Sequence, residues 1–268
     1  MTRYTTRYTY RLTDNLDPEE RLEEAALWKA MHDRFGDAIV PVTGDVHADY
    51  GRLRRQDTKP GMPYWNDPAF LREARRSFVT MPYDDAKSEV ARLHNLGQSA
   101  FVKSTRDKHA IFRCPVGTSL SEAMGDFVYS FIDGGPALMV QEMVEMTYEW
   151  RFFVMDRRIV TDSTNHPDLT PLNFPCRVAY RTTEGHESCG VGGFMRQPLF
   201  DVAQRIAASM ATPTAVIDCA YINGNAGCVE LNPLHLGNVG LFACDVRALA
   251  DAAFNLRTNA PNPETSNG

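Results

Sequence analysis

The chain has 268 residues, of which 43% are hydrophobic and 23% charged, and its formal net charge is −6. This composition is that of an ordinary globular protein, and the acidic balance disfavours a broad nucleic-acid-binding surface without excluding a local basic groove. No apolar run approaches the roughly 20 residues that span a bilayer and the N-terminus lacks a secretory signal core, so we expect a cytoplasmic protein with no membrane partner.

The first helix signal begins at Asp17, which can cap a helix, and continues with Pro18, which suits the first helical position. Glu20 then stands where a capping box needs an acid, and Gly36 offers a left-handed stop. The expected apolar side of this helix consists of Leu22, Ala25, Ala26 and Met31, with Leu27 or Phe35.

After this helix, residues 38–42 predict a short strand, and the pattern is then lost in a loop-rich stretch over residues 43–66. Further elements are expected before Gly97: a helix at 67–76, a strand at 78–81 and a helix at 84–96. The arginine clusters in this region (Arg52, Arg54 and Arg55, then Arg72, Arg75 and Arg76) are interpreted as solvated faces.

Beyond Gly97 short β-like runs dominate, interrupted by helices, which favours an α+β fold with largely antiparallel strands. The expected strands are 100–104, 110–113, 137–140, 150–155, 158–161, 177–181, 215–221 and 227–232. The expected helices are 121–131, 198–210 and 245–256. The six cysteines form no Cys-x-x-Cys pair, so free thiols are expected rather than a zinc site or a disulfide framework.

The most informative segment is residues 215–234, where two apolar runs flank an Asn-Gly turn at residues 223–225. A turn centred on Gly224 places Asp218 opposite Glu230. Because alternate side chains of a strand share a face, Asn232 joins the two acids. The opposite face, which suits a core, carries Ile217, Cys219, Tyr221, Val229 and Leu231.

Two acids facing one another destabilise a hairpin unless a cation neutralises them. Mg²⁺ prefers oxygen ligands and keeps waters and phosphate oxygens in its shell, so a few protein ligands suffice. The hairpin therefore predicts a metal site at Asp218, Glu230 and Asn232. The alternative is a solvated acidic face, and a register slip of one residue would separate the acids.

Asp218, followed by the Val-Glu-Leu-Asn-Pro run at residues 229–233, resembles the metal-binding hairpin of ATP-grasp enzymes. In that family an aspartate and a Glu-x-Asn on the next strand hold Mg²⁺ between ATP phosphates. The resemblance implies the α+β ATP-grasp fold, in which two α+β subdomains sandwich ATP. It also implies ATP and Mg²⁺ as cofactors, with Mn²⁺ as an alternative metal. The pattern is closest to a compact group from phages and bacteria whose substrates are mostly unassigned.

Two upstream segments agree with the resemblance in order and spacing. Lys103, in the strand at 100–104, matches the family's strand-borne lysine that reaches the nucleotide phosphates, and Lys108 or Arg113 is a candidate second phosphate contact. Residues 137–145 resemble the strand that links the two subdomains and lines the adenine pocket. By position, the residues that would flank the base are Gln141, Glu142 and Met143, and Glu145 would bind the ribose hydroxyls.

The resemblance also implies a division of the chain. Residues 1–81 are expected to form a short N-terminal α/β region with a candidate role in substrate binding. Residues 82–256 would form the ATP-grasp domain, with its subdomain linker near 140–145, and residues 257–268 a flexible tail. One departure is the loop over the phosphates, which should be rich in glycine, whereas residues 107–118 contain only Gly117.

The activity that the resemblance implies is a ligase that joins a carboxylate to an amine through an acyl-phosphate, releasing ADP and phosphate. An arginine should hold the acyl-phosphate, because a planar guanidinium matches phosphate geometry, and the candidates are Arg151 and Arg177, with Arg181 behind them. Two alternatives stay open: an ATP-grasp kinase that phosphorylates a small molecule, and a non-catalytic ATP-binding module.

Overall fold

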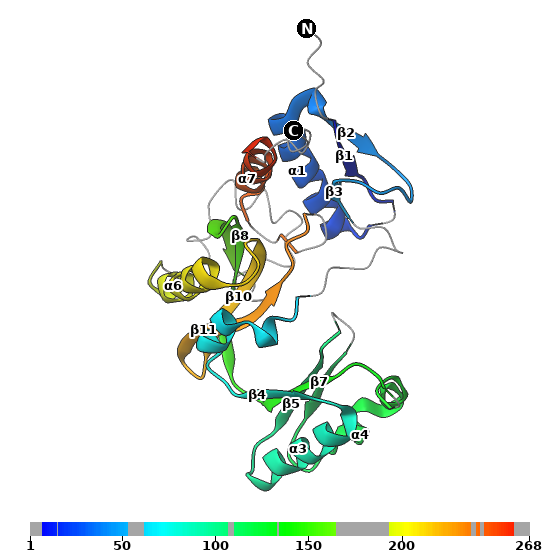
Figure 1. The fold of residues 1–268 in the computed structure, drawn as a ribbon, viewed down its shortest axis with the longest axis vertical. Helices are drawn as coiled ribbons and strands as arrows, with labels where there is room; N and C mark the ends of the chain where they lie inside the picture. Colours follow the sequence, from blue (N-terminus) through cyan, green and yellow to red (C-terminus); the bar gives the residue numbers. More distant parts are fainter. Residues whose placement is uncertain are drawn as a thin grey trace, which may run out of the picture.

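The computed structural model describes residues 7–14, 16–52, 62–106, 110–132, 134–164, 193–236, 240–241 and 244–259. Three β-sheets follow one another along the long axis of the molecule, each with its own helices (Figure 1). The predicted strand at 177–181, Lys108, Arg177 and Arg181 lie outside the described residues.

The N-terminal sheet is parallel, and its order is β2-β1-β3, from β1 (Tyr8–Arg11), β2 (Ile39–Val42) and β3 (Tyr50–Gly51). Helix α1 (Pro18–Phe35) follows β1 and ends at the 3-10 turn η1 (Gly36–Ala38). Its start is as predicted, because the Asp17 side chain accepts the backbone N–H of Glu20 at 2.8 Å. Helix α7 (Val246–Asn259) packs beside α1.

The predicted apolar side of α1 is correct only in its second half. Leu27, Met31 and Phe35 are buried, whereas Leu22 and Ala25 are exposed. The first turns face the protein through a polar contact instead, because the buried carboxylate of Glu24 accepts the backbone N–H of Thr13 at 2.9 and 3.0 Å. An acid that satisfies the chain leaving β1 takes the place that an apolar side chain was expected to fill.

The middle sheet is antiparallel, with the order β11-β10-β8-β9. Its strands are β8 (Met146–Met155), β9 (Arg158–Thr164), β10 (Ala215–Ile222) and β11 (Asn225–Asn232). One face packs on α6 (Gly193–Ser209), α2 (Pro68–Glu73) and η2 (Tyr64–Asn66), through residues such as Phe152 and Ile217. The other face packs on α1 and α7, through Phe153 and Val216.

The third sheet has the order β4-β7-β5-β6 and is also antiparallel. Its strands are β4 (Phe78–Met81), β5 (Ala100–Ser104), β6 (Ile111–Cys114) and β7 (Leu138–Glu142). Helices α3 (Tyr83–Asn95) and α4 (Leu120–Met124) cover one face, and a 3-10 helix η3 (Gly125–Ser130) continues from α4. The predicted helix at 121–131 is thus divided, because the chain adopts a positive φ of 51° at Gly125.

The pairing of β4 with β7 bears on the predicted boundary at residue 81. Residues of η2 and α2 also pack in the core of the middle sheet, so this part of the chain lies with the two antiparallel sheets. The boundary stays a prediction, and these contacts favour an earlier one.

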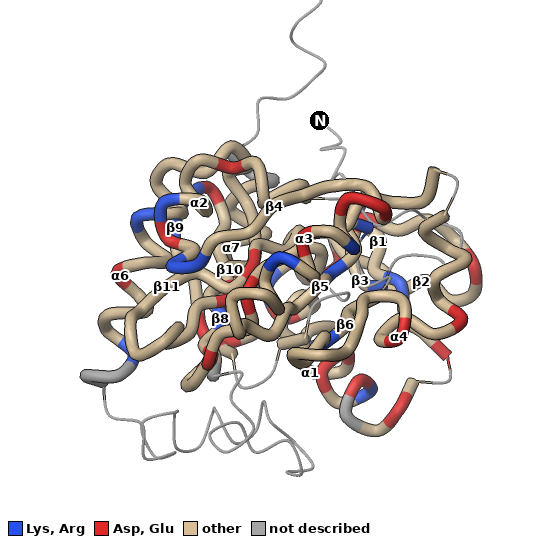
Figure 2. The backbone as a smooth tube through the Cα atoms, turned by 90° about the horizontal axis from the view of Figure 1, so that it is seen from below, with Lys and Arg blue, Asp and Glu red and all other residues tan. Residues whose placement is uncertain are grey.

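The surface and the helices agree with two expectations from composition. Acidic and basic residues are interspersed along the described backbone, and the basic ones do not gather on one side (Figure 2). None of the described helices combines the length and apolar character needed to cross a membrane. The four described cysteines, Cys114, Cys219, Cys228 and Cys244, are buried thiols.

Candidate active site

The β10–β11 hairpin pairs Asp218 with Glu230, as the sequence predicts, but by a different route. The turn has two residues, Asn223 and Gly224, with φ of 48° and 78°. Near this turn Cys219 faces Cys228, and the register then shifts by one residue before it reaches Asp218. The extra residue is a β-bulge, which restores the pairing that a turn centred on Gly224 would have given.

The bulge corrects one predicted position. Val229 was expected in the core, but it lines a cavity, and Cys228 takes the core position beside Cys219 and Leu231. The bulge therefore turns the backbone between Cys228 and Glu230 toward the cavity, while the acid pair keeps its place.

Asp218 is fully buried and is held by Arg151 of the neighbouring strand β8. The guanidinium donates from Nε and Nη2 to the two carboxylate oxygens at 2.8 and 2.9 Å, and its Nη1 donates to the carbonyl of Gly240 at 3.1 Å. Burial raises the pKa of Asp218, and the paired guanidinium opposes that rise. The contacts favour a role for Arg151 in orienting Asp218, and its predicted role at an acyl-phosphate stays a prediction.

Glu230 forms an ion pair with Lys103, which projects from β5 in the third sheet. Lys103 Nζ also donates to the hydroxyl of Tyr64 at 3.3 Å, and the ammonium lies over that ring. Burial alone would raise the pKa of Glu230, but Lys103 and Asn232 hold it below its usual value. The same pair raises the pKa of Lys103, so both groups are charged at neutral pH.

Asn232 connects the two acids. Its side-chain amide donates to Asp218 Oδ2 at 3.1 Å and to Glu230 Oε1 at 2.9 Å. The three residues predicted as metal ligands are therefore brought together within one hydrogen-bonded group.

The donor set of this group fits a hard divalent cation. Carboxylate and amide oxygens are suitable ligands for Mg²⁺, and no cluster of three or more His, Cys, Asp or Glu is found among the described residues. The protein thus offers fewer ligands than a full octahedron needs, which suits a metal that also binds phosphate oxygens and waters. Glu230 is the more available ligand, because both oxygens of Asp218 already accept from Arg151.

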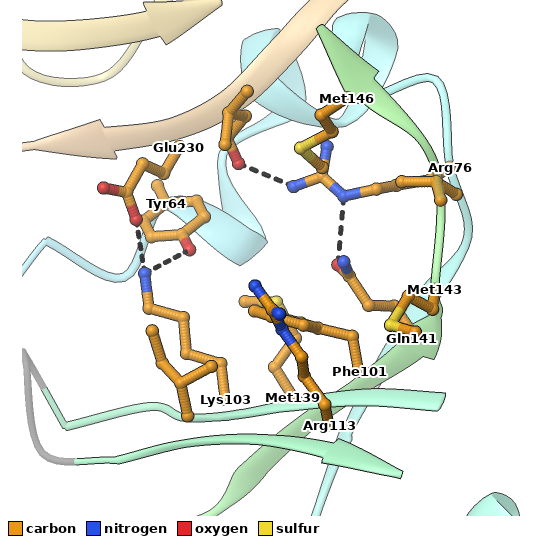
Figure 3. Close-up of a pocket in the computed structure, with 13 residues that line it drawn as sticks. Tyr64, Arg76, Phe101, Lys103, Arg113, Met139, Gln141, Met143, Met146 and Glu230 are labelled. Carbon is orange, nitrogen blue, oxygen red and sulfur yellow. Dashed lines mark hydrogen bonds and ion pairs between the residues drawn. The ribbon is translucent and has the colours of Figure 1, made fainter. Parts of the chain in front are cut away.

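A cavity of about 530 Å³ adjoins the acid group, between the third sheet and the edge of the middle sheet (Figure 3). Its apolar walls consist of Phe101, Ile111, Met139, Met143, Val144, Met146 and Val229. Its polar lining residues are Tyr64, Arg76, Lys103, Arg113, Gln141 and Glu230. Mostly apolar walls with a few placed polar groups, and a volume in this range, are typical of small-molecule and cofactor sites.

The predicted linker residues divide between this cavity and other places. Gln141 and Met143 line the cavity, together with Arg113, the alternative phosphate contact. Glu142 points to the other face of β7, where it accepts the side-chain amide of Gln98 at 3.0 Å. Glu145 is exposed and does not line the cavity, and its backbone N–H donates to the Asn223 side chain at 3.1 Å.

Arg76 is a site residue that the sequence did not reveal. Its Nε donates to Gln141 Oε1 at 3.0 Å, and its Nη1 and Nη2 donate to the carbonyls of Cys228 and Val229 at 2.7 and 2.6 Å. It therefore ties the linker strand β7 to the bulge of β11 across the end of the cavity (Figure 3). Burial lowers the pKa of Arg76, whose acceptors here are amide oxygens of the side chain and the backbone.

A second, smaller cavity of about 180 Å³ lies beside the first and shares Tyr64 and Lys103 with it. Asn232 and the following Pro233 line it, so it adjoins the acid group from the other side. Lys103 thus stands where the two cavities meet.

Comparison with known proteins gives a family and two structural neighbours. The model of an ATP-grasp domain, the second family of its clade, matches residues 74–249. A RimK domain protein ATP-grasp from Sphaerobacter thermophilus has a TM-score of 0.53 at 15% identity, over 91% of this chain and 98% of that chain. D-cycloserine synthetase DcsG has a TM-score of 0.52 at 14% identity, over 92% and 99%. At these identities the likeness is one of fold alone. Comparison with curated proteins gave no match.

Proposed function

Because the chain belongs to the ATP-grasp family, we propose that it is an ATP- and Mg²⁺-dependent ligase that joins a carboxylate to an amine. The predicted family and the α+β fold are confirmed. The acyl-phosphate route, the amide product and the residue roles given below belong to the proposal.

One observation carries the proposal: Lys103 and the acid group of Asp218, Glu230 and Asn232 meet at the end of a cavity large enough for a nucleotide. A cation and a metal-binding group at one end of an apolar cavity suit a ligand with a flat apolar base and a charged phosphate tail. The DcsG and RimK-domain neighbours support a ligase over other uses of this fold, because D-cycloserine synthetase is named as a synthetase.

Each described group has a task in this reaction. The apolar side chains of Phe101, Met139 and Met143 would sandwich the base, and Lys103 and Arg113 would offset phosphate charge. Glu230, Asp218 and Asn232 would hold Mg²⁺, which when bound bridges and neutralises phosphate oxygens. Arg151 would keep Asp218 ionised and oriented. A substrate carboxylate oxygen attacks the γ-phosphorus as the bond to ADP breaks, and an amine then displaces phosphate from the acyl carbon and loses a proton.

The test is the thermal stability of wild type and Glu230→Ala, with and without Mg²⁺-ATP. A ligand that binds only the folded state at about 100 times its Kd adds roughly 2.7 kcal/mol. We expect a clear upward shift of Tm in wild type that is lost in Glu230→Ala. The matched control is Asp84→Asn, which changes an exposed acid on α3 and should keep the shift.

Two outcomes separate the proposal from its alternatives. No shift in wild type at millimolar Mg²⁺-ATP would remove the nucleotide site itself. Where the shift is present, ADP release that requires both an acid and an amine supports the ligase, whereas release with a phosphate acceptor alone indicates a kinase, and no turnover over a broad panel indicates a binding module.

A further inference from the structure

We propose that the smaller cavity binds the body of the carboxylate substrate, and that this substrate is a monocarboxylic acid with a compact apolar body and no ammonium group. The inference rests on the proposed function, because it places the carboxylate beside the phosphate that Lys103 contacts. It deepens that function by naming a class of acid.

The position of the cavity is the first support. Tyr64 and Lys103 line both cavities, and Asn232 lines the smaller one, so the smaller cavity begins where the nucleotide cavity ends. A nucleotide whose base lies beside Gln141 and whose phosphates reach Lys103 would point its terminal phosphate toward this opening. The reacting carboxylate must approach the γ-phosphate there, within contact distance.

The walls of the cavity are the second support. They are mostly apolar, with side chains from the segment before η2, from η2 itself and from the end of β11. These residues are Met62, Pro63, Trp65, Leu231 and Pro233. The volume of about 180 Å³ slightly exceeds that of a cavity of about 150 Å³ that binds benzene. One ring or one branched alkyl group therefore fits, whereas a sugar would leave its hydroxyls without partners.

The polar groups at the cavity are the third support, because most are already used. The hydroxyl of Ser104 accepts the backbone N–H of Arg106 at 3.1 Å, and that of Thr105 donates to the carbonyl of Ala137 at 2.8 Å. The one cation among the described lining residues is Lys103, and none of them is acidic. An anionic head would be matched by Lys103, but an ammonium group would enter without a counter-charge, which is costly in an apolar site.

The experiment uses hydroxylamine as the amine, so that the natural second substrate need not be known. The acyl-phosphate loses phosphate to hydroxylamine and gives a hydroxamate, which is measured together with ADP. The acids are matched pairs: 4-methylpentanoate against L-leucine, and 3-phenylpropanoate against L-phenylalanine, which differ by the ammonium group. Glutarate replaces the apolar end by a second carboxylate.

We expect kcat/KM for each apolar acid to exceed that of its amino acid and of glutarate by at least tenfold. Trp65→Ala should shift the preference toward a bulkier acid such as 5-phenylpentanoate while the Mg²⁺-ATP shift of Tm is kept. Met62→Ala provides a second enlargement if the first variant does not fold. The control is Tyr129→Ala, which alters an aromatic residue that is 78% exposed and should change nothing.

The remaining outcomes overturn the inference. If the amino acids or glutarate react as well as the apolar acids, or if no acid gives hydroxamate while Mg²⁺-ATP still stabilises the protein, the substrate class is wrong and the nucleotide site stands. Loss of preference change in both enlarged variants, when they fold and bind Mg²⁺-ATP, places the acid elsewhere. Absence of any Mg²⁺-ATP stabilisation in wild type ends the proposed function, and the inference with it.

Discussion

At the scale of single residues, the contact between Arg76 and Gln141 determines what the cavity offers to a nucleobase. Arginine has only donors, so the oxygen of the Gln141 amide must be the atom that accepts from Arg76 Nε. The NH₂ group of Gln141 then remains, in a side chain that is 5% exposed and lines the cavity. The cavity thus presents a fixed donor at this point, suited to a ring nitrogen of adenine that accepts a hydrogen bond.

This fixed donor gives a prediction for Gln141→Leu. The loss of one neutral hydrogen bond, worth about 0.5–1.5 kcal/mol, should weaken ATP binding about 3- to 10-fold. Wild type should lose a similar factor with either 1-deaza-ATP or 7-deaza-ATP, whichever lacks the nitrogen that is contacted, and Gln141→Leu should not lose it again. Isothermal titration with all three nucleotides measures this.

The matched control is Gln98→Leu, because this amide donates to Glu142 on the far face of β7. It should leave the affinities for ATP and both analogues unchanged. Equal affinities of wild type for ATP and both deaza analogues would show that Gln141 does not read a ring nitrogen.

Arg76 also shows where the reading of a sequence stops at the residue scale. Three arginines within five positions suggest a solvated face, and Arg75 indeed is half exposed. The backbone, however, takes a positive φ of 53° at Arg75, so its neighbour turns inward to the carbonyls of β11. The sequence at Arg75 has no glycine that would announce such a turn, and the acceptors lie about 150 residues away along the chain. Local patterns contain neither fact.

At the scale of elements, the hairpin was predictable because its turn, its apolar face and its acids all lie within one short segment. The bulge at Val229 was not, because an extra residue in one strand leaves the alternation of the other unchanged. The strands β1 and β3 were missed for another reason. Parallel strands pair with partners far along the chain, so no local turn marks them, and β3 has only two residues.

The hairpin turn carries a prediction at this scale. Gly224 has a φ of +78°, and a Cβ added there would meet no atom within 4 Å, so any cost of substitution comes from the backbone. Gly224→Ala should lower the free energy of unfolding by about 1–2 kcal/mol. Gly224→Asn should cost less, because asparagine tolerates the left-handed region better than alanine does. Urea unfolding of the two variants compares them directly.

The same pair of variants tests whether the turn merely closes the hairpin or also sets the acids. The acids lie beyond the bulge, so we expect the Mg²⁺-ATP shift of Tm to persist in both variants. Equal losses of stability for alanine and asparagine would show that the left-handed backbone is not what the glycine supplies.

At the scale of the whole molecule, the N-terminal α/β region shares its core with the middle sheet. One cluster of buried residues joins α1 and α7 to the face of β8 and β10 that carries Phe153 and Val216. Phe35 lies at the centre of this cluster, with its ring 5.5 Å from that of Tyr8, 5.7 Å from that of Tyr50 and 5.0 Å from that of Phe254. The sequence could predict α1 but not its partners, because they come from both ends of the chain.

This shared core predicts that the N-terminal region does not unfold by itself. Phe35→Ala should cost about 3–5 kcal/mol, because it removes a buried ring and leaves a cavity. Phe127→Ala, at a side chain that is 55% exposed, should change the free energy of unfolding by no more than about 0.5 kcal/mol. We expect a single urea transition in each variant, with the same midpoint by far-UV circular dichroism and by tryptophan fluorescence. The fluorescence reports on both parts, because Trp28 lies on α1 and Trp150 in the middle sheet. If Phe35→Ala instead splits the transition in two, with Mg²⁺-ATP stabilising only the later step, the N-terminal region is a separate folding unit, and the cluster is an interface between domains rather than one core.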